Sequence, residues 1–331
     1  MINGKSVLIT GGTGSLGKAL TKYLFKNYPE IKRLIIFSRD EQKQFIMAQD
    51  YPPEKYPSIR FFLGDVRDKE RLIRAFKKVD IVIHAAAMKH VHLAEYNPDE
   101  CIKTNIGGAQ NVIHAALENS VSNVVALSTD KACSPVNLYG ATKLTSDKLF
   151  IAGNNIKGDT PIKLSVVRYG NVMGSNGSVI PFFLNKRHTG KLPITDPSMT
   201  RFNISLEEGV KIVMHAIENA LGGEIFIPKI PSYKIVDVVK AIDSNCEIEI
   251  IGIRPGEKIH EEMISSADSY NTYDLGNYYA ILPSKTSFDI NYFIEKTGAE
   301  KVKSGFSYAS NNNSEWETIA SLQEKIKQLN L

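Results

Sequence analysis

The chain is poor in cysteine and has no long apolar run, and each scarcity excludes a class of protein. Its three cysteines, Cys101, Cys133 and Cys246, are widely spaced and odd in number. They form neither a disulfide framework nor a paired zinc-ligand pattern, so we expect a reducing, cytoplasmic location. No segment approaches the roughly 18 apolar residues that a membrane helix needs. A strand pattern begins at Ser6, where a signal peptide would still be running, so we expect no membrane association.

An excess of one charge is also absent. The chain has 40 Lys and Arg against 36 Asp and Glu, a net charge of +4, and no concentrated basic block. We therefore expect no nucleic-acid partner, although a local cationic pocket for a phosphorylated small molecule fits this balance. The 331 residues, 43% of them hydrophobic, predict a globular protein of two domains, or one core with a smaller appendage.

What is present in the first half is a regular alternation of short β-branched runs and helical patterns. The predicted strands cover residues 6–10, 33–38, 59–63, 81–84, 124–128 and 164–168, and the predicted helices 18–27, 69–77, 105–119 and 139–152. Strands that alternate with helices through right-handed connections form a parallel sheet with helices on both faces. The fold class predicted is therefore α/β, with a Rossmann-type doubly wound parallel sheet.

A glycine-rich segment joins the first strand to the first helix. Gly11 permits a tight turn, Gly14 lets the backbone approach a pyrophosphate, and Gly17 lets the helix pack close to the sheet. The free amides and the dipole at the helix N-terminus then hold the anion. The residues predicted to form this phosphate cradle are Gly11, Thr13, Gly14, Ser15, Leu16 and Gly17.

The end of the second strand indicates which dinucleotide binds. Arg39 stands where it can stack on adenine and bind a 2′-phosphate, with Ser38 and Lys43 as helpers, so the sequence favours NADP. Asp40 keeps NAD open, because an acid here usually holds the ribose hydroxyls. Further residues expected at the cofactor are Glu41, Gln42, Asp65 and Val66 near the adenosine, and Ala85, Ala86 and Ala87 after the fourth strand.

The texture changes after Asn171, where Gly and Pro become frequent. We predict an NADP-binding domain over residues 1–174, with later elements returning to it. Residues 175–331 are predicted to form a smaller substrate-binding domain and a C-terminal tail. The tail is expected to close with an amphipathic helix over 316–331.

A Tyr-x-x-x-Lys pattern follows the fifth strand. Tyr139 and Lys143 are one helical turn apart and therefore share a face of the helix. A lysine charge beside a phenol favours the phenolate and lowers the phenol's pKa. Such a phenolate can take the proton of a sugar hydroxyl while a nicotinamide oxidises the carbon.

From the glycine cradle through Tyr139-x-x-x-Lys143 the chain resembles an extended short-chain dehydrogenase/reductase. The resemblance implies that Thr129, just after the fifth strand, helps to orient the reacting hydroxyl. It also implies that Tyr139, Lys143 and Val172 lie at the cofactor.

Asp130 and Lys131 indicate the subclass. In similar nucleotide-sugar dehydratases the triplet is Thr-Asp-Glu, and here Lys131 replaces the Glu, as in the inverting UDP-N-acetylglucosamine 4,6-dehydratases, whose best-known members begin pseudaminic acid biosynthesis. Other segments that match this family span nearly the whole chain: 84–91, 94–98, 168–172, 193–196, 199–202 and 254–258. The resemblance implies a hydro-lyase acting on UDP-N-acetylglucosamine, and a homo-oligomer for which a hexamer is one form.

The reaction that this resemblance implies has three steps on one tightly bound, recycled NADP. Tyr139 acts as base while carbon 4 is oxidised; Lys131 then removes the carbon-5 proton and Asp130 protonates the departing carbon-6 hydroxyl. Carbon 6 is finally reduced and carbon 5 is reprotonated from the opposite face, with Lys131 and Tyr139 both candidates for that proton. The product would be UDP-2-acetamido-2,6-dideoxy-β-L-arabino-hex-4-ulose.

Two protonation states follow from this scheme. Lys131 must be neutral, which burial and the nearby charges of Lys89 and Lys143 would favour by lowering its pKa. Asp130 must be protonated, so its pKa should be raised in a dry site. The alternative is that Asp130 and Lys131 form an exposed ion pair or a turn cap.

Further residues are expected at the substrate. Arg201 and Arg254 are predicted to bind the diphosphate bidentately, although a surface salt bridge is the alternative for each. Glu257 is assigned to the uridine ribose, Thr195 to uracil, and Lys89 and Asn171 to the mouth of the sheet. His84, His90 and His92 cluster by number, but no acid or Cys pattern accompanies them, and no metal site is predicted.

Two other functions stay open from the residues alone. A UDP-N-acetylhexosamine 4-epimerase, or a nucleotide-sugar dehydratase of different stereochemistry, would use the same tyrosine and cofactor. A non-catalytic NADP-binding sensor could share the fold, but it would have no need of Tyr139, Lys143 and the Asp130–Lys131 pair.

Overall fold

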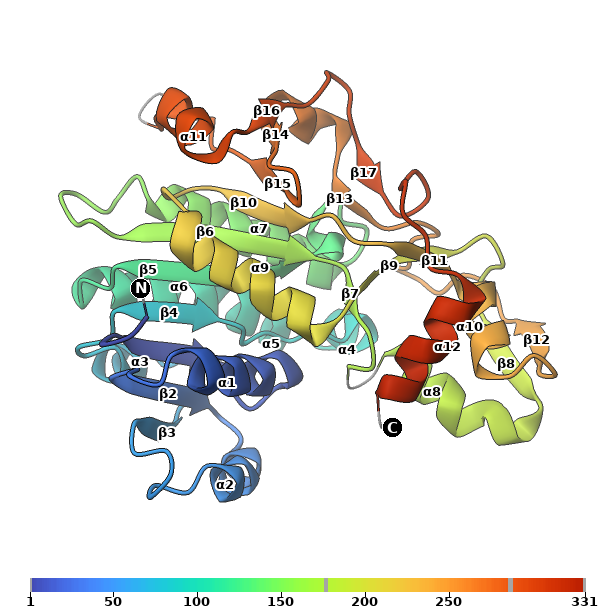
Figure 1. Cartoon of the computed structure of the whole chain (residues 1–331), viewed down its shortest axis with the longest axis horizontal. Helices are drawn as coiled ribbons and strands as arrows, with labels where there is room; N and C mark the ends of the chain where they lie inside the picture. Colours follow the sequence, from blue (N-terminus) through green and yellow to red (C-terminus); the bar gives the residue numbers. More distant parts are fainter. Residues whose placement is uncertain (1, 176–177, 285–287, 330–331) are drawn as a thin grey trace.

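The computed structural model describes residues 2–175, 178–284 and 288–329. Its centre is a ten-stranded sheet in the order β16-β14-β15-β10-β6-β5-β4-β1-β2-β3 (Figure 1). The strands of this sheet are β1 (Ser6–Thr10), β2 (Arg33–Ser38), β3 (Ile59–Leu63), β4 (Ile81–His84), β5 (Asn123–Thr129), β6 (Lys163–Tyr169), β10 (Ile225–Pro228), β14 (Thr272–Asp274), β15 (Tyr278–Ile281) and β16 (Glu300–Lys301).

The sheet is parallel from β3 to β10 and antiparallel beyond it. β1 pairs with β2 on one side and β4 on the other, so the chain reverses its direction across the sheet at β1. Ligands of doubly wound sheets bind at the carboxyl ends of the strands beside such a point. The predicted fold class is confirmed.

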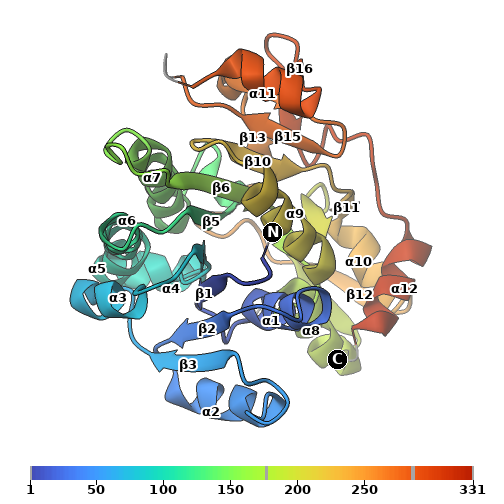
Figure 2. The ribbon, with the colours of Figure 1, turned by 60° about the vertical axis from the view of Figure 1, so that its left-hand side comes forward.

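Helices cover both faces of this sheet (Figure 2). The helices around the main sheet are α1 (Ser15–Asn27), α2 (Glu41–Asp50), α3 (Lys69–Ala75), α4 (Val91–Tyr96), α5 (Pro98–Ile102), α6 (Gly108–Glu118), α7 (Leu138–Gly153), α9 (Leu206–Asn219) and α11 (Ile290–Thr297). Helices α1 and α9 pack on one face, and α3, α6 and α7 on the other. Along β1, Val7 and Ile9 pack in the core under α1 and α9, Leu8 packs in the core under α3, α6 and α7, and all three are fully buried. A strand buried on both faces explains the continuous apolar run in the sequence.

A smaller assembly with its own core lies beside the carboxyl ends of the strands (Figure 1). It contains α8 (Val179–Lys186), β8 (Lys191–Ile194), α10 (Ile235–Ile242), β12 (Glu247–Ile250) and α12 (Ile319–Gln328). The strands that connect it to the main sheet are β7 (Asn171–Val172), β9 (Thr200–Ile204), β11 (Ser232–Lys234), β13 (Glu262–Ile264) and β17 (Tyr308–Ala309). This arrangement leaves the space between the two cores open to a ligand.

In the first half of the chain, the sequence did not predict α2, α4 and α5, and the predicted helices differ from the observed ones at their ends. α1 begins at Ser15 rather than residue 18, and α6 begins at Gly108, because a π-helical turn (Lys103–Gly107) precedes it. α3 ends at Ala75 rather than 77, and α12 begins at Ile319 rather than 316. The last two residues of that predicted helix, 330–331, lie outside the described residues.

Strands from beyond residue 175 complete the main sheet. β10 pairs parallel to β6, and β15, β14 and β16 continue from it in antiparallel fashion. The first 174 residues therefore share one sheet with later parts of the chain. Within the described ranges, none of the helices combines the length and apolar character that a bilayer crossing requires.

Candidate active site

The glycine-rich turn between β1 and α1 is held tightly against the loop after β4. Gly11 has φ +67°, and a Cβ there would stand 2.9 Å from the backbone of Ala86. Only glycine fits such a position without strain. A Cβ on Gly17 would collide with the backbone of Gly12, so Gly17 lets the helix pack against the turn itself rather than against the sheet.

The start of α1 has the features of an anion site. Gly14 is the N-cap and provides no side-chain cap for the amides of Ser15, Leu16 and the residues that follow. The first amides of a helix have no partner within it, and they carry the positive end of the helix dipole. The hydroxyls of Thr13 and Ser38 lie 2.9 Å apart, which ties this turn to the end of β2. The cradle fits a pyrophosphate at this place.

At the end of β2, the carboxylate of Asp40 already has its partners in α2. Its carboxylate caps α2 by accepting from the Lys43 amide, and it lies 2.9 Å from the Lys43 ammonium. Arg39 is 61% exposed and lies 3.7 Å from Asp65. Burial alone would raise the pKa of Asp65, but hydrogen bonds and charge from Arg67 outweigh it and lower that pKa. Glu41 and Gln42 form the first turn of α2.

A buried network fixes the backbone after β4. The amides of Ala85 and Ala86 donate to Thr10 Oγ1 at 3.2 and 3.3 Å, and Thr10 Oγ1 lies 2.8 Å from His84 Nδ1. Burial, assisted by the charge of Lys143, lowers the pKa of His84 to about 3. His84 is therefore neutral and shares a hydrogen bond with the Thr10 hydroxyl, which gives it a structural role beside the loop that continues to Ala87.

The catalytic residues predicted from the sequence meet at the end of β5. Asp130 and Lys131 form a short 3₁₀ turn directly after Thr129, and Tyr139 and Lys143 lie on α7 beside it. Lys143 Nζ donates to the Leu127 carbonyl at 2.6 Å, which fixes this side chain under the strand.

The protonation of Tyr139 differs from the expectation. Its pKa is raised to about 12, because burial outweighs the opposing effects of the Lys131 charge and a hydrogen bond with Thr129. The prediction of a phenol pKa lowered by Lys143 is therefore wrong for this structure. Burial lowers the pKa of Lys143 itself.

Lys131 and Asp130 do not form an exposed ion pair. Its Nζ lies 3.1 Å from Asp130 Oδ1 and 3.1 Å from Glu261 Oε1, and both carboxylates are almost fully buried. Burial alone would lower the pKa of Lys131, but these two negative charges outweigh it and raise that pKa. The expected neutral Lys131 is therefore wrong for this arrangement of charges, because two carboxylates rather than Lys89 and Lys143 determine its state.

Asp130 behaves as expected. Burial raises its pKa, against the opposing charge of Lys131, and Glu261 adds to the increase. Its Oδ1 accepts from Thr129 Oγ1 at 2.8 Å. Its Oδ2 is buried and has no hydrogen-bond partner within the described part of the chain. A carboxyl with one buried free oxygen can hold a proton and deliver it to a ligand.

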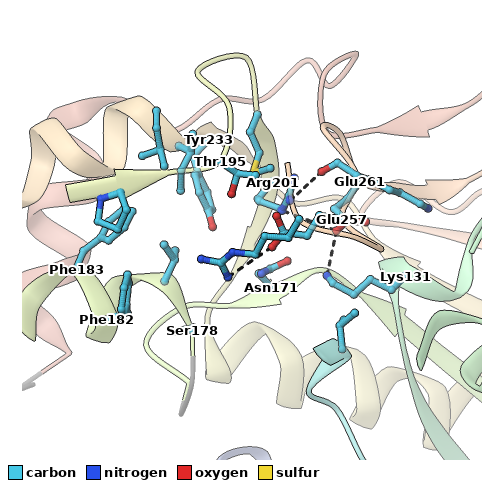
Figure 3. Close-up of a pocket in the computed structure, with 18 of the residues that line it drawn as sticks. Lys131, Asn171, Ser178, Phe182, Phe183, Thr195, Arg201, Tyr233, Glu257 and Glu261 are labelled. Carbon is cyan, nitrogen blue, oxygen red and sulfur yellow. Dashed lines mark hydrogen bonds and ion pairs between the residues drawn. The ribbon is translucent and has the colours of Figure 1, made fainter. Parts of the chain in front are cut away.

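Lys131 opens into a cavity of about 570 Å³ between the two cores (Figure 3). Five of the six predicted substrate residues line it: Asn171, Thr195, Arg201, Arg254 and Glu257. Lys89, the sixth, follows β4 and is solvent-exposed, although partial desolvation by its neighbours lowers its pKa. Val172 is half-buried next to Asn171 on β7 and packs on the main core. The structure thus brings the acid–base pair and the predicted substrate residues into one place.

The two predicted phosphate-binding arginines differ. Arg201 is buried, and its guanidinium donates to the carbonyls of Thr200, Ile259 and Lys258 at 2.7, 3.0 and 2.9 Å. Arg254 is 59% exposed at the rim and lies 3.8 Å from Glu257. Arg254 thus has its guanidinium available to a diphosphate, whereas Arg201 mainly fixes the backbone around Glu261.

Several cavity residues were not anticipated from the sequence. They are Ser178, Phe182, Phe183, Tyr233, Lys258 and Glu261. Glu261 stands three residues beyond the matched segment 254–258, and that proximity was the one available signal. Asn171 Oδ1, Ser178 Oγ, Glu257 Oε2 and Glu261 Oε2 are all buried and lack hydrogen-bond partners in the described ranges. Unpartnered buried oxygens at one cavity indicate a polar ligand with several donors.

Comparisons with known proteins agree with this geometry. Residues 7–283 match the family described as "Polysaccharide biosynthesis protein". A curated relative from Campylobacter jejuni, named UDP-N-acetylglucosamine 4,6-dehydratase (inverting), is 59% identical over 98% of each chain. A Rickettsia canadensis protein named UDP-glucose 4-epimerase is 43% identical over 93% of this chain and 91% of its own.

A solved structure is also closely similar. The X-ray structure of Pen from Bacillus thuringiensis superposes with a TM-score of 0.88 at 36% identity, covering 100% of this chain and 99% of the other. The similarity therefore includes both the main sheet and the smaller assembly.

Proposed function

The chain belongs to the polysaccharide biosynthesis protein family, and from this membership we propose that it is an inverting UDP-N-acetylglucosamine 4,6-dehydratase. The observation that carries the proposal is the Asp130–Lys131 pair, buried beside Tyr139 and open to the cavity through Lys131. A 4-epimerase needs no acid and base side by side at this position. The C. jejuni relative, 59% identical, has the dehydratase name.

The proposed mechanism divides the work among the residues at the end of β5. Tyr139 takes the proton of the carbon-4 hydroxyl as a phenolate, a state that the Lys131 charge and the Thr129 hydrogen bond favour and that burial opposes. Thr129 orients that hydroxyl. A bound nicotinamide would supply the hydride transfer, out from carbon 4 and back to carbon 6. Lys143, fixed on the Leu127 carbonyl, would help to hold the cofactor's ribose. Oxidation at carbon 4 acidifies the carbon-5 proton, because the resulting carbanion is an enolate.

Elimination is assigned to the adjacent pair. Lys131 removes the carbon-5 proton, and Asp130 gives its proton to the departing carbon-6 hydroxyl. The raised pKa of Asp130 supports the acid role, since a buried carboxyl with a raised pKa stays protonated to higher pH. Reprotonation of carbon 5 from the opposite face gives the inverted configuration, with Lys131 and Tyr139 as the candidate donors.

NADP is the proposed cofactor, tightly bound and recycled. Asp40 caps α2 and pairs with Lys43, which leaves the exposed Arg39 as the side chain available to a 2′-phosphate. Arg39→Ala should weaken NADP binding to the nucleotide-free enzyme by about tenfold or more, because it removes a charge-assisted hydrogen bond. Binding of NAD should change little, and Arg74→Ala, an exposed arginine on α3, is the control. Equal weakening of both dinucleotides would contradict the assignment.

The nucleotide sugar is proposed to lie across the cavity. Arg254 binds the diphosphate, Glu257 the uridine ribose and Thr195 the uracil, while Asn171 and Lys89 face the sugar. Arg201 supports this set through the backbone. The residues after 174 thus supply the proposed contacts to the UDP part, whereas the first 174 residues supply the cofactor site together with Lys89, Asn171 and the catalytic residues.

The direct test is turnover of UDP-N-acetylglucosamine without added nicotinamide. The proposal predicts a product that has lost one water, seen by mass spectrometry, at a constant total of bound cofactor. An unchanged mass with a new configuration at carbon 4 would identify the alternative, a 4-epimerase, which the Rickettsia relative favours. No reaction with any UDP-N-acetylhexosamine would favour the non-catalytic sensor.

Three further parts of the proposal concern the cell. We assign the product to the first step of pseudaminic acid biosynthesis, the enzyme to the cytoplasm, and the active form to a homo-oligomer. Light scattering tests the last of these, and a monomer at working concentration would contradict it.

A further inference from the structure

Glu261 lies directly before β13 and reaches into the cavity next to Lys131 (Figure 3). Its Oε1 is 3.1 Å from Lys131 Nζ, and its side chain is 3% exposed. Its backbone is held independently, because its amide and carbonyl both bond to Ser310, at 2.9 and 2.7 Å. The carboxylate is therefore not needed to anchor the loop.

Lys131 is thus shared between two carboxylates at the same distance. Asp130 and Glu261 each approach Nζ with one oxygen at 3.1 Å. Each keeps its other oxygen buried and without a hydrogen-bond partner in the described part of the molecule. The ammonium of Lys131 needs only one negative charge to balance it. One of the two buried carboxyls can therefore stay ionised while the other holds a proton.

We propose that Glu261 is the positioning residue that supplies the counter-charge of Lys131, accepts a proton from it before elimination, and so leaves Asp130 protonated as the acid. This inference rests on the proposed dehydratase function and adds a third member to its elimination machinery. The acid role is assigned to Asp130 because this carboxyl also accepts a hydrogen bond from the Thr129 hydroxyl at the end of β5, next to the reacting sugar in the proposed mechanism.

The surrounding groups favour an ionised Glu261 and a protonated Asp130 in the resting site. Arg201 on β9 lies 3.8 Å from Glu261, and Lys258 adds a second positive charge, so the pKa of Glu261 is lowered although burial alone would raise it. Near Asp130, burial dominates and its pKa is raised. Two phenols also face the pair: Tyr139 on α7 interacts with Asp130, and Tyr233 on β11 interacts with both carboxylates.

The protons balance without any further reactant. The Lys131 ammonium first gives one proton to Glu261, which breaks an N–H bond and forms an O–H bond. The free amine then takes the carbon-5 proton, while the carbon-6–oxygen bond breaks and Asp130 protonates the oxygen, so that water leaves. Lys131 finally passes a proton to Asp130 and recovers one from Glu261. The carbon-5 proton replaces the one lost with water, and the carbon-4 hydroxyl proton taken by Tyr139 balances the proton returned to carbon 5, so the site returns to its starting state.

The test uses Glu261→Gln in the full-length holoenzyme, followed by stopped-flow nicotinamide absorbance and by product formation. The variant should still reduce its bound NADP on mixing with UDP-N-acetylglucosamine, while kcat for water loss falls about 100-fold or more and KM changes little. Glu262→Gln is the matched control, since that neighbour bonds Ser134 and Cys133 and lies outside the cavity.

The pH profile separates a charge effect from a structural one. Removing a negative charge lowers the pKa of both Asp130 and Lys131. In the pH profile of the residual kcat of Glu261→Gln, the alkaline limb, where Asp130 loses its proton, should therefore move to lower pH. The acid limb, where Lys131 becomes a free base, should move to lower pH as well. The carbonyl-stretching infrared band of protonated Asp130, assigned with Asp130→Asn, should disappear at a correspondingly lower pH.

Unchanged kcat with an unchanged profile in Glu261→Gln would overturn the inference while an active wild type keeps the dehydratase function. A wild type without water loss would overturn both. If Glu261→Gln does not fold, Glu261→Asp replaces it, because it keeps the charge on a shorter side chain. This variant should slow water loss and spare carbon-4 oxidation, and equal loss of the two steps would contradict the role.

Discussion

At the scale of single residues, the charge of Lys131 is the feature on which the proposed mechanism depends. Its Nζ stands between Asp130 and Glu261, and their negative charges raise its pKa although burial opposes them. A buried ammonium becomes a base only when a neighbour takes its proton. The structure places two such neighbours at contact distance.

Lys131→Ala should remove the base while keeping the site for carbon-4 oxidation. We expect water loss to fall by about 10²- to 10⁴-fold, the usual range for loss of a general base, while slow reduction of NADP by the bound sugar persists. Product analysis and nicotinamide absorbance measure the two steps separately. Lys148→Ala, an exposed lysine on α7, should leave both unchanged. Full turnover by Lys131→Ala would refute the assignment.

His84 provides a test of pH dependence at one buried residue. Its pKa falls from 6.5 to about 3 on folding, because of burial and then the Lys143 charge. A depressed histidine pKa gives stability that is complete above 6.5 and is lost as pH falls toward 3. Between pH 7 and pH 5 this group alone should cost about 2 kcal/mol of unfolding free energy.

Urea unfolding of His84→Asn at the two pH values measures that contribution. The asparagine oxygen can accept from Thr10, so the variant should show a pH dependence smaller by about 2 kcal/mol than the wild type. His92→Asn, an exposed histidine, should retain the wild-type dependence. An identical pH dependence in His84→Asn would show that His84 is not the group that titrates.

The residue types of the catalytic cluster could be predicted from sequence, but their protonation could not. Tyr139, Asp130 and Lys131 follow from spacing and resemblance. Glu261 is 130 positions away from Lys131 and reaches it only through the fold. The expected pKa of Lys131 was wrong for this reason, because the charge that decides it belongs to a distant segment.

At the scale of elements, the turn between β1 and α1 combines an unusual backbone angle with a close approach. Gly11 and Gly4 both have positive φ, +67° and +74°, but a Cβ on Gly4 would meet nothing within 4 Å, whereas on Gly11 it would meet Ala86. The two glycines therefore separate the cost of the angle from the cost of crowding.

Gly4→Ala should lower the unfolding free energy by about 1 kcal/mol through the angle alone. Gly11→Ala should lower it by more, about 1 to 3 kcal/mol, and should also weaken dinucleotide binding, because the turn must move away from Ala86. Urea unfolding and dinucleotide titration measure the two effects. Equal losses in both variants, with binding unaffected, would show that the close approach is unimportant.

The helices and strands with the clearest hydrophobic pattern were predicted most accurately. Buried parallel strands were located almost to the residue, since their continuous apolar runs have no competing interpretation. Helix ends were less certain, because α1 includes Ser15 from the glycine segment and a π-helical turn interrupts the helix expected from residue 105. Such features depend on tertiary contacts that local sequence does not encode.

At the scale of the whole molecule, the two halves of the chain share one sheet. β10 pairs with β6, α9 packs against β5 and β6, and Phe226 and Ile227 are fully buried in the two cores. The sequence predicted that later elements return to the first domain, but composition could not indicate which strand would pair with β6.

A fragment of residues 1–174 should therefore fail to fold cooperatively. It would expose the edge of β6 and the face that α9 covers, and an uncovered apolar sheet favours aggregation. Thermal unfolding followed by circular dichroism tests this expectation against the full chain. A sharp, reversible transition in the fragment would show that the first 174 residues form an autonomous domain.

The most direct test of the proposed function is NMR of the sugar formed from UDP-N-acetylglucosamine in deuterated water. A dehydratase that inverts carbon 5 must yield a 4-keto-6-deoxy sugar with deuterium at carbon 5 and the L-arabino configuration. A product that differs only at carbon 4 and carries no deuterium at carbon 5 would contradict the roles of Lys131 as base and Asp130 as acid.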